Sequence, residues 1–430
     1  MAITGRTLLL VLLGLPAVPL RPQASTAWLW LLLVLVVVAV DTWAASPPRR
    51  LMVTRTTTAP VRLGFATTTS LVVANTGRRA WTGVLRDAWQ PSAGATDNRH
   101  PVSLGPQETS RLTTPLSPNR RGDRRTDRIT ARSIGPLGLA GRQRSWPVPG
   151  AVRVLPPFPS RRHLPSRLAR LRELDGRSAV RLRGPGTEFD SLREYVRGDD
   201  VRSIDWRASA RNRNVVVRTW QPERDRRVVL VLDTSRTSAA RVGDTPRLDA
   251  AMDSALLLAA LAARAGDRVD LVAGDRRVRA RVRWGAREST VSRLLQSMAD
   301  LEPALVEADW STLVGAAVSV SRQRSLMVLL TSLEPAAMVE GLLPALPTLA
   351  ARHRVVVASV RDPALDAMAA DHVDAARVYD AAAAAYELGR RDQMREVLNG
   401  LGVDVVDALP DMLPVALTDH YLALKARGLL

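Results

Sequence analysis

The feature that most constrains the fold is a regular alternation of apolar runs and helical patterns that begins after Arg227. The first run, Val228–Leu232, is β-branched or Leu throughout and stops on Asp233. A strand with no polar face is buried on both sides, which is typical of a parallel sheet covered by helices. The alternation predicts an α/β fold with a doubly wound sheet, whose ligands would lie at the carboxyl ends of the strands.

The alternation also predicts the elements of this C-terminal domain, residues 227–430. The expected strands are Val228–Asp233, Val269–Ala273, Ala280–Trp284, Leu326–Leu330, Val355–Val360 and Val403–Val406. The expected helices are Leu248–Ala265, Thr290–Leu301, Thr312–Arg322, Ala336–Arg352, segments within 364–400 and one within Met412–Arg427. Elements of these lengths favour right-handed crossover units.

Two apolar segments, residues 3–20 and 27–44, open the chain. The second is long enough to cross a bilayer and has Trp28 and Trp43 near its ends, where interfacial indoles are common. The first is short, and it is either a signal-peptide core or the first arm of a helical hairpin. We favour a transmembrane hairpin over residues 1–46.

The charges around the second segment predict its orientation. Arg49, Arg50 and Arg55 follow it, whereas Arg21 is the one Arg in the stretch between the two segments. The positive-inside bias therefore predicts the inner (plasma) membrane as the location, with the bulk of the chain in the cytoplasm.

Residues 47–155 change to short alternating runs separated by Gly, Pro and Asn, which is typical of a small β-sandwich-like domain. The expected strands are Val61–Ala66, Ser70–Ala74, Trp81–Trp89, Glu108–Thr114 and Arg128–Ser133. Residues 156–226 follow as a linker, with a basic helix over His163–Asp175, and an Arg/Asp-rich signature segment. No catalytic grouping is evident in the β-domain.

The formal net charge of +19 comes almost wholly from Arg, since Lys425 is the only Lys. A basic chain prefers anionic partners. No RNP-like motif, zinc spacing or helix-turn-helix signal accompanies the charge, so we expect no nucleic-acid partner. The chain has no Cys, which excludes disulfides and thiol chemistry.

The first strand of the C-terminal domain ends in the pattern Asp-x-Ser-x-Thr, at Asp233, Ser235 and Thr237. This pattern resembles the start of the metal-ion-dependent adhesion site (MIDAS) of von Willebrand factor A domains. A hard cation prefers oxygen ligands, and one strand end supplies a carboxylate and two hydroxyls. Thr312, at the start of a later helix, matches the Thr that the site adds from another loop.

A second carboxylate expected at the site is missing, because Ser332 stands where the pattern has Asp. Losing one of two anionic groups weakens cation binding unless Glu334 takes its place. We therefore expect a degenerate site with Mg²⁺ bound weakly or not at all, and a stronger response to Mg²⁺ in Ser332→Asp.

The signature segment alternates Arg with Asp and Glu around aromatic residues. Its candidate site residues are Glu188, Arg193, Tyr195, Gly198, Asp199, Asp200, Arg202, Asp205, Trp206 and Arg211. We favour an ion-pair network that orders the segment, because every carboxylate has Arg nearby and no nucleophile or His accompanies them. On this interpretation a buried Trp206 anchors the segment to the sheet and Asp205 pairs with Arg202 or Arg211.

The alternative is a metal-dependent hydrolase that uses Asp199, Asp200 and Asp205 together with Asp233. No catalytic constellation in the sequence supports it, so we expect no enzyme. Retained turnover that Asp205→Asn abolishes would favour this alternative.

The segment from Gly186 to Arg211 resembles the signature of a bacterial domain-of-unknown-function family, the fifty-eighth. Ser133–Leu139, with Leu137 in place of Phe, and Asp419–Gly428 resemble two further elements of that family. The resemblance implies a membrane-anchored, cytoplasmic, von Willebrand A-like interaction protein. It also implies a MoxR-type AAA+ ATPase as partner, acting in assembly or maturation of unknown client proteins. The family has no established biochemical activity.

Overall fold

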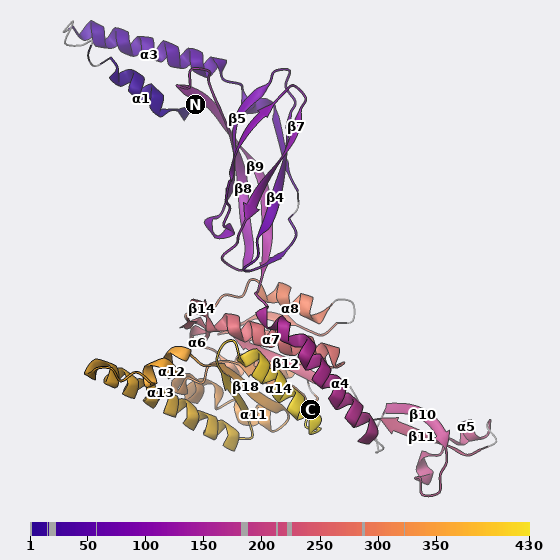
Figure 1. Cartoon of the computed structure of the whole chain (residues 1–430). Helices are drawn as coiled ribbons and strands as arrows, with labels where there is room; N and C mark the ends of the chain where they lie inside the picture. Colours follow the sequence, from indigo (N-terminus) through magenta and orange to yellow (C-terminus); the bar gives the residue numbers. More distant parts are fainter. Residues whose placement is uncertain are drawn as a thin grey trace. The chain divides into compact units, whose positions relative to one another are not determined.

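The computed structural model describes residues 2–14, 16, 23–56, 58–181, 188–211, 214–221, 226–285, 289–321 and 323–430. The chain divides into two compact units, Met1–Leu155 and Pro156–Leu430 (Figure 1). Each unit has its own sheets and its own core, and each is described separately below.

The first unit contains two β-sheets that share a core. One has the order β1-β9-β8-β5-β6, with β3 beside β9, and the other has the order β2-β4-β7. The strands are β1 (Ala2–Ile3), β2 (Leu51–Arg55), β3 (Val61–Arg62), β4 (Thr67–Asn75), β5 (Trp81–Trp89), β6 (Arg99–Leu104), β7 (Thr109–Leu116), β8 (Gly122–Ile134) and β9 (Ala140–Leu155). Leu71 of β4 and Leu85 of β5 meet in the core between the sheets.

The sequence missed β1, β2, β6 and β9 in this unit. Strand β9 contains Pro147 and Pro149, which remove ladder donors and argue against a strand. The structure nevertheless pairs β9 with β8 over most of its length, with a register shift between Thr126 and Arg128 of β8. A shift of this kind lets the ladder accommodate the prolines.

Two helices precede the β-sheets, α1 (Gly5–Leu12) and α3 (Ala24–Ala44). The 21 residues of α3 extend about 31 Å, close to the ~30 Å of a hydrocarbon core. Among the described residues, α3 provides the one helix long and apolar enough to cross a membrane. The 8 residues of α1 span about 12 Å, so this helix, as far as the structure describes it, is shorter than a hydrocarbon core. Arg21 lies outside the described residues.

The second unit is built on a six-stranded sheet of order β16-β15-β12-β17-β18-β19. Its strands are β12 (Arg227–Asp233), β15 (Arg268–Gly274), β16 (Val278–Val282), β17 (Leu326–Leu330), β18 (Arg354–Val360) and β19 (Asp404–Ala408). Five strands are parallel, and β16 pairs antiparallel with β15 at one edge. The carboxyl ends of the parallel strands therefore meet along one rim, as the sequence predicts.

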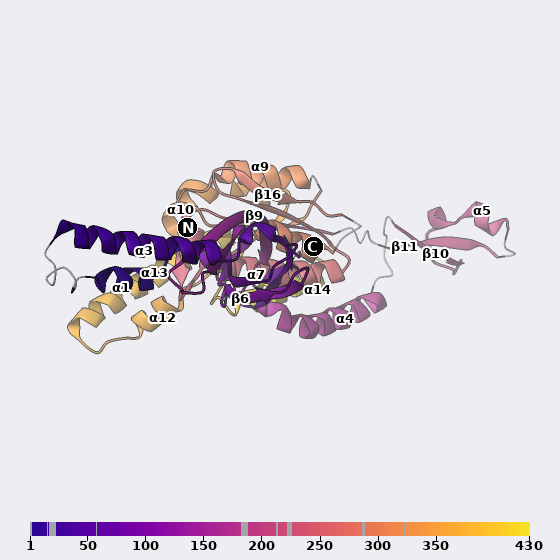
Figure 2. The ribbon, with the colours of Figure 1, turned by 90° about the horizontal axis from the view of Figure 1, so that it is seen from above.

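Helices cover both faces of this sheet (Figure 2). The helices that contact the sheet are α7 (Arg247–Arg264), α8 (Thr290–Met298), α9 (Trp310–Val320), α11 (Leu346–Ala350), α13 (Ala375–Gly400) and α14 (Leu413–Ala426). Helix α12 (Pro363–Ala369) packs against α13. Val229 and Val231 of β12 share a core with α9, α11 and α13. Leu230 points to the opposite face, where α7 and α14 contact the sheet.

The single helix expected over Ala336–Arg352 is broken into three short pieces. They are α10 (Pro335–Ala337), the π-helical turn η5 (Met338–Leu342) and α11. Pro344 and Pro347 each remove a backbone donor and clash with the preceding turn, so a continuous helix cannot form. The predicted helix Thr312–Arg322 is α9, which begins two residues earlier; Arg322 lies outside the described residues.

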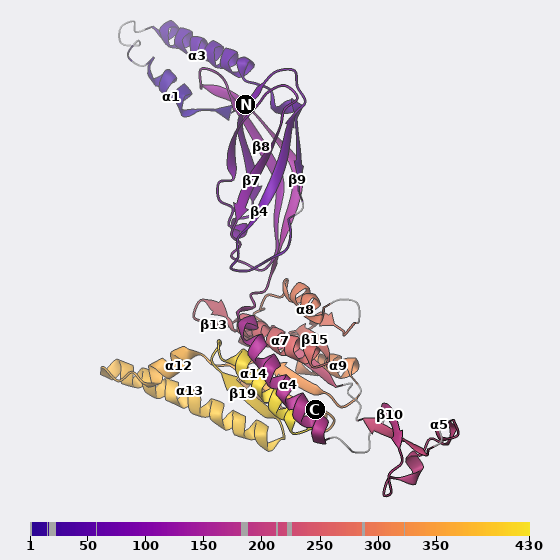
Figure 3. The same cartoon turned by 45° about the vertical axis from the view of Figure 1, so that its right-hand side comes forward.

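The linker helix is longer than predicted. The 3-10 helix η3 (Pro159–His163) leads into α4 (Leu164–Arg181), which runs along α14 (Figure 3). Asp419 of α14 accepts hydrogen bonds from Arg167 at 3.0 Å and from Arg170 at 3.2 Å. The C-terminal signature Asp419–Gly428 thus has a structural role, in which it fastens the linker helix to the sheet.

Candidate functional site

The strand-end site is centred on Asp233, at the carboxyl end of β12, where only 1% of the residue is exposed. Its Oδ1 accepts a hydrogen bond from the backbone N–H of Ser235 at 2.7 Å. Its Oδ2 accepts from the hydroxyls of Thr237 at 2.9 Å and Thr331 at 2.7 Å. Burial raises the pKa of Asp233 against the opposing effect of these hydrogen bonds. Thr331, the first residue after Leu330 of β17, therefore completes the shell around this carboxylate.

Thr312 has a different partner from the one the metal-site pattern predicts. Its hydroxyl donates to Asp309 Oδ2 at 2.6 Å and its backbone N–H donates to Asp309 Oδ1 at 3.1 Å. Asp309 is the N-cap of α9, and donation from Ser311 and then Thr312 lowers its pKa to about 2. The Thr312 hydroxyl is thus engaged in capping the helix.

Arg247 lies beside Ser332 at the rim of the same site. Its Nη1 donates to Ser332 Oγ at 3.3 Å and to Glu334 Oε1 at 2.7 Å. Arg247 and Ser332 line a small pocket together with Thr237 and Thr331, the two residues whose hydroxyls donate to Asp233. Glu334 is therefore paired with a guanidinium.

Sequence reasoning missed Arg247. A signal was available, because Arg247 is the first residue of α7, where the partial positive charge of a helix N-terminus disfavours a cation. An arginine at such a position needs an anionic partner, and the chain offers Glu334, the N-cap residue of α10 in the connection after β17.

The residues at the strand end do not fit a resident divalent cation. Mg²⁺ prefers carboxylate and water oxygens. One carboxylate, Asp233, is in place, both of its oxygens already accept hydrogen bonds, and a guanidinium contributes the positive charge at the rim. Within the described ranges, no group of three or more His, Cys, Asp or Glu residues could hold a metal ion.

The signature segment folds as a hairpin, which we call the signature hairpin, residues 188–221. Strand β10 (Glu188–Glu194) pairs antiparallel with β11 (Val216–Gln221), and η4 (Val201–Ser203) and α5 (Trp206–Ser209) lie in the connection. The Tyr195 N–H donates to Val215 O, so the pairing extends past β10. Gly198 has a φ of 116°, a conformation that favours glycine.

Ion pairs order the hairpin connection, as the sequence predicts. Arg193 donates two hydrogen bonds to Asp199, at 2.7 and 2.6 Å, and this contact is the main cause that lowers the pKa of Asp199. Asp200 accepts from the backbone N–H of Arg202 and caps η4. Each carboxylate therefore serves as a structural acceptor.

The predicted partner of Asp205 is wrong. Its Oδ2 pairs with Arg218 of β11 at 2.8 Å, not with Arg202 or Arg211, and its Oδ1 accepts from two backbone N–H groups at the start of α5. The Ala208 N–H and then Arg218 lower the pKa of Asp205. Antiparallel pairing brings Arg218 within reach, which linear spacing could not reveal.

The predicted burial of Trp206 is also wrong, because the residue is 66% exposed. Among the hairpin side chains that the structure describes, the buried apolar ones are Val216 and Val217 of β11. Val196, at 61%, and Val201, at 60%, are exposed like Trp206. These three residues are named the exposed apolar group below. Arg202 and Arg211 are exposed too, and the side chain of Glu188 lies outside the described residues.

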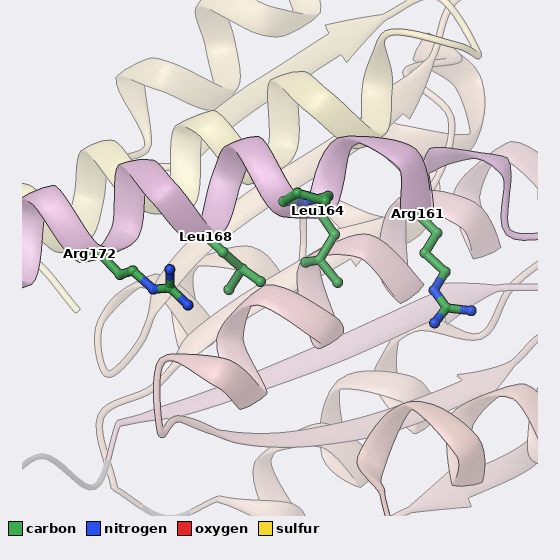
Figure 4. Close-up of a pocket in the computed structure, with 5 residues that line it drawn as sticks. Arg161, Leu164, Leu168 and Arg172 are labelled. Atoms are coloured by element: carbon green, nitrogen blue, oxygen red, sulfur yellow. The ribbon is translucent and has the colours of Figure 1, made fainter.

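A groove of about 340 Å³ lies on the linker helix. Leu164, Pro165 and Leu168 line it between Arg161 and Arg172. The side chains of Leu164 and Leu168 project from the same side of α4 (Figure 4). No acid, nucleophile or His is among these lining residues, so the groove offers no catalytic group.

Residues 191–397 match the model of the family described as "Protein of unknown function DUF58", which confirms the family predicted from the motifs. The uncharacterized proteins Rv1480 of Mycobacterium tuberculosis and Mb1516 of Mycobacterium bovis are each 30% identical over 184 residues, 42% of this chain and 56% of theirs. The chain thus spans about half the length of these curated relatives.

Two solved structures resemble parts of the chain weakly. The conserved hypothetical protein BatB from Bacteroides thetaiotaomicron is 14% identical, with a TM-score of 0.31 and coverage of 46% of this chain and 98% of BatB. An aerotolerance-related membrane protein from Bacteroides fragilis is 16% identical, with a TM-score of 0.24 and coverage of 31% and 67%.

Proposed function

Because the chain belongs to the DUF58 family over residues 191–397, we propose that it is a membrane-anchored interaction protein that docks a protein partner on its signature hairpin. The observation that carries this proposal is the exposure of Trp206, at 66%, on a segment whose backbone is ordered by ion pairs and helix caps. A large indole held in solvent by an ordered frame is a feature of recognition surfaces.

The composition of the hairpin surface supports a partner of defined chemistry. Trp and Arg are the residues most enriched among interface hot spots. Here the exposed apolar group, Trp206, Val196 and Val201, lies on a segment with exposed Arg197, Arg202 and Arg207. The surface therefore suits a partner that offers an apolar pocket with an acidic rim.

The rest of the proposal follows the family resemblance. The second unit would be a von Willebrand A-like, doubly wound domain with a degenerate MIDAS, and the first unit a β-sandwich-like domain. The partner would be a MoxR-type AAA+ ATPase, acting on client proteins in their assembly or maturation. Helix α3 would anchor the chain in the plasma membrane, with the two units in the cytoplasm.

The hydrolase alternative has less support. Asp199, Asp200 and Asp205 each accept hydrogen bonds from a different neighbour within the hairpin, and Asp233 is enclosed by hydroxyls. A hydrolytic metal site needs several carboxylates directed at one point. No specific observation favours this function.

Binding of a purified MoxR-type ATPase to the full-length protein in lipid nanodiscs tests the proposal. Trp206→Ala should weaken binding by about 30-fold or more, the equivalent of the 2 kcal/mol that defines a hot spot. Trp284→Ala is the matched control, because Trp284 is also partly exposed, at 42%, and lies outside the hairpin. Equal binding by both variants would contradict the proposal.

A further inference from the structure

A buried carboxylate lies in the last turn of the apolar helix α3. Asp41 is 1% exposed, and its two oxygens accept hydrogen bonds from three backbone N–H groups, of Leu137 at 2.8 Å, Leu139 at 2.8 Å and Ala140 at 2.9 Å. These donors come from the turn between β8 and β9. They replace the water that an aspartate at the end of an apolar helix would otherwise need.

The same turn also holds the beginning of α1. The Thr4 hydroxyl donates to Gly138 O at 2.7 Å, and the Thr7 hydroxyl donates to Leu139 O at 2.5 Å. Strand β1 pairs with β9, so the start of α1 and the end of α3 meet at one place (Figure 1). We call residues 135–142, which make these contacts, the helix clamp.

Two further contacts show that the clamp fits its helix closely. Arg142 Nε donates to Thr42 O at 2.9 Å. A Cβ on Gly135 would lie 2.3 Å from both the backbone oxygen and a carboxylate oxygen of Asp41. These contacts therefore fix the position of the β8–β9 turn along the axis of α3, level with the last turn of that helix.

The length of α3 fixes that height relative to a membrane. Its 21 residues span about 31 Å, so when the helix crosses a ~30 Å hydrocarbon core its last turn lies at the boundary with the head groups. Leu137, whose N–H is bonded to Asp41, lies at the same level. Exposed apolar side chains gather there: Ile134 at 47%, Leu137 at 54% and Trp43 at 79%.

We propose that the helix clamp, together with the adjoining Ile134 at the end of β8, is a lipid-contacting surface, on which Ile134 and Leu137 enter the interfacial layer of the bilayer beside Trp43. The first unit is then held against the membrane instead of swinging freely on its anchor. A single exposed apolar residue is common on protein surfaces and does not indicate a binding partner. These residues, however, adjoin the end of a helix long enough to cross a membrane, so we infer that lipid is what they contact. The inference rests on the membrane anchoring in the proposed function.

The absence of Cys from the sequence allows a direct test. Spin labels on single cysteines, Leu137→Cys and the matched control Asn119→Cys on an exposed turn of the same unit, are compared in the full chain reconstituted in liposomes. Collision with oxygen, which concentrates in lipid, is measured against collision with a water-soluble nickel chelate. Position 137 should give a severalfold higher oxygen-to-nickel ratio than position 119.

Two results would overturn the inference. A label at position 137 that is as accessible to nickel as position 119 would lie in water. A label shielded from both reagents would be covered by protein. A label at Val36→Cys, on the exposed face of α3, distinguishes membrane anchoring by α3 from lipid contact by the helix clamp. If position 36 reports lipid while position 137 reports water, the anchoring is supported and the lipid-contacting surface is wrong. A label at Val36→Cys that reports water overturns both.

The role of Asp41 has its own readout. Asp41→Ala should raise the mobility of the label at position 137 and remove its lipid signature. Asp41→Asn, which keeps the shape and one acceptor, should give an intermediate result. An unchanged lipid signature in both variants would show that the Asp41 contacts do not position this surface.

Discussion

Arg247 should prevent Mg²⁺ from binding at the strand end, and this prediction can be given a magnitude. At an effective dielectric constant of 20, two unit charges 4 Å apart interact by about 4 kcal/mol. For a divalent ion at an assumed separation of about 8 Å from the guanidinium, the same relation gives a repulsion of up to about 4 kcal/mol, because the paired Glu334 carboxylate offsets part of it. That energy corresponds to a loss of about 1,000-fold in affinity.

The structure changes what restoring the missing carboxylate should achieve. In Ser332→Asp, the new carboxylate would lie beside Arg247, whose Nη1 is 3.3 Å from Ser332 Oγ, and would pair with it. We therefore expect little Mg²⁺ response from Ser332→Asp alone, although the sequence pattern suggests one. The double variant Ser332→Asp/Arg247→Ala combines two carboxylates with no guanidinium, so it should bind.

Thermal unfolding of the full-length protein in detergent, with and without about 10 mM Mg²⁺, measures the difference. A site with Kd of about 1 mM gains about 1.4 kcal/mol, a rise of about 3 °C in Tm, whereas a site 1,000-fold weaker gains nothing measurable. Ser332→Asp/Arg241→Ala is the matched control, since Arg241 is exposed and outside the strand-end pocket. A rise of several degrees in the unmodified protein or in Ser332→Asp would refute the reasoning.

Three further predictions concern the rest of the chain. Burial raises the pKa of Asp253 to about 6, so its ionisation should lower the free energy of unfolding by up to about 3 kcal/mol as the pH rises from about 4 to about 6. Denaturant titrations at each pH measure this loss, which Asp253→Asn should remove while keeping an acceptor for Ser160. An equal loss of stability in Asp253→Asn would show that Asp253 is not its cause. Gly135→Ala should lower Tm by several degrees, because its methyl group overlaps Asp41, and an unchanged Tm would show that the clamp can shift. A cysteine at Asn119 should react with an impermeant maleimide only after spheroplasts are lysed; reaction in intact spheroplasts would reverse the proposed topology.

The sheet of the second unit could be predicted because its strands have no polar face. The predicted strand Leu326–Leu330 has the bounds of β17, and Val228–Asp233 differs from β12 by one residue. In contrast, β9 carries prolines, glycines and arginines that hide its pairing. Its place depends on long-range partners in β8, which local propensity does not contain.

Some residues of the candidate site could likewise be predicted from the sequence, and others could not. Asp233, Ser235 and Thr237 were found because one strand end delivers them in a fixed spacing. Arg247 was missed, because it reaches the site from another element and only the folded sheet brings it there.

Trp206 and Asp41 show how far composition can mislead. A Trp flanked by ion pairs suggested burial, yet Trp206 is 66% exposed. The one acidic residue in the apolar segment, Asp41, was overlooked, although a lone charge at the end of such a segment requires a partner.

Photo-crosslinking from position 206 in living cells tests the central claim most directly. A benzoylphenylalanine is placed at position 206 in the full-length protein, with position 284 as the matched control, and the crosslinked species are identified by mass spectrometry. The account predicts a crosslink from position 206, and none from position 284, to an AAA+ ATPase of the MoxR type. It also predicts that Trp206→Ala leaves the unfolding midpoint unchanged. Crosslinks confined to the protein's own sheet, together with a lowered midpoint in Trp206→Ala, would contradict it.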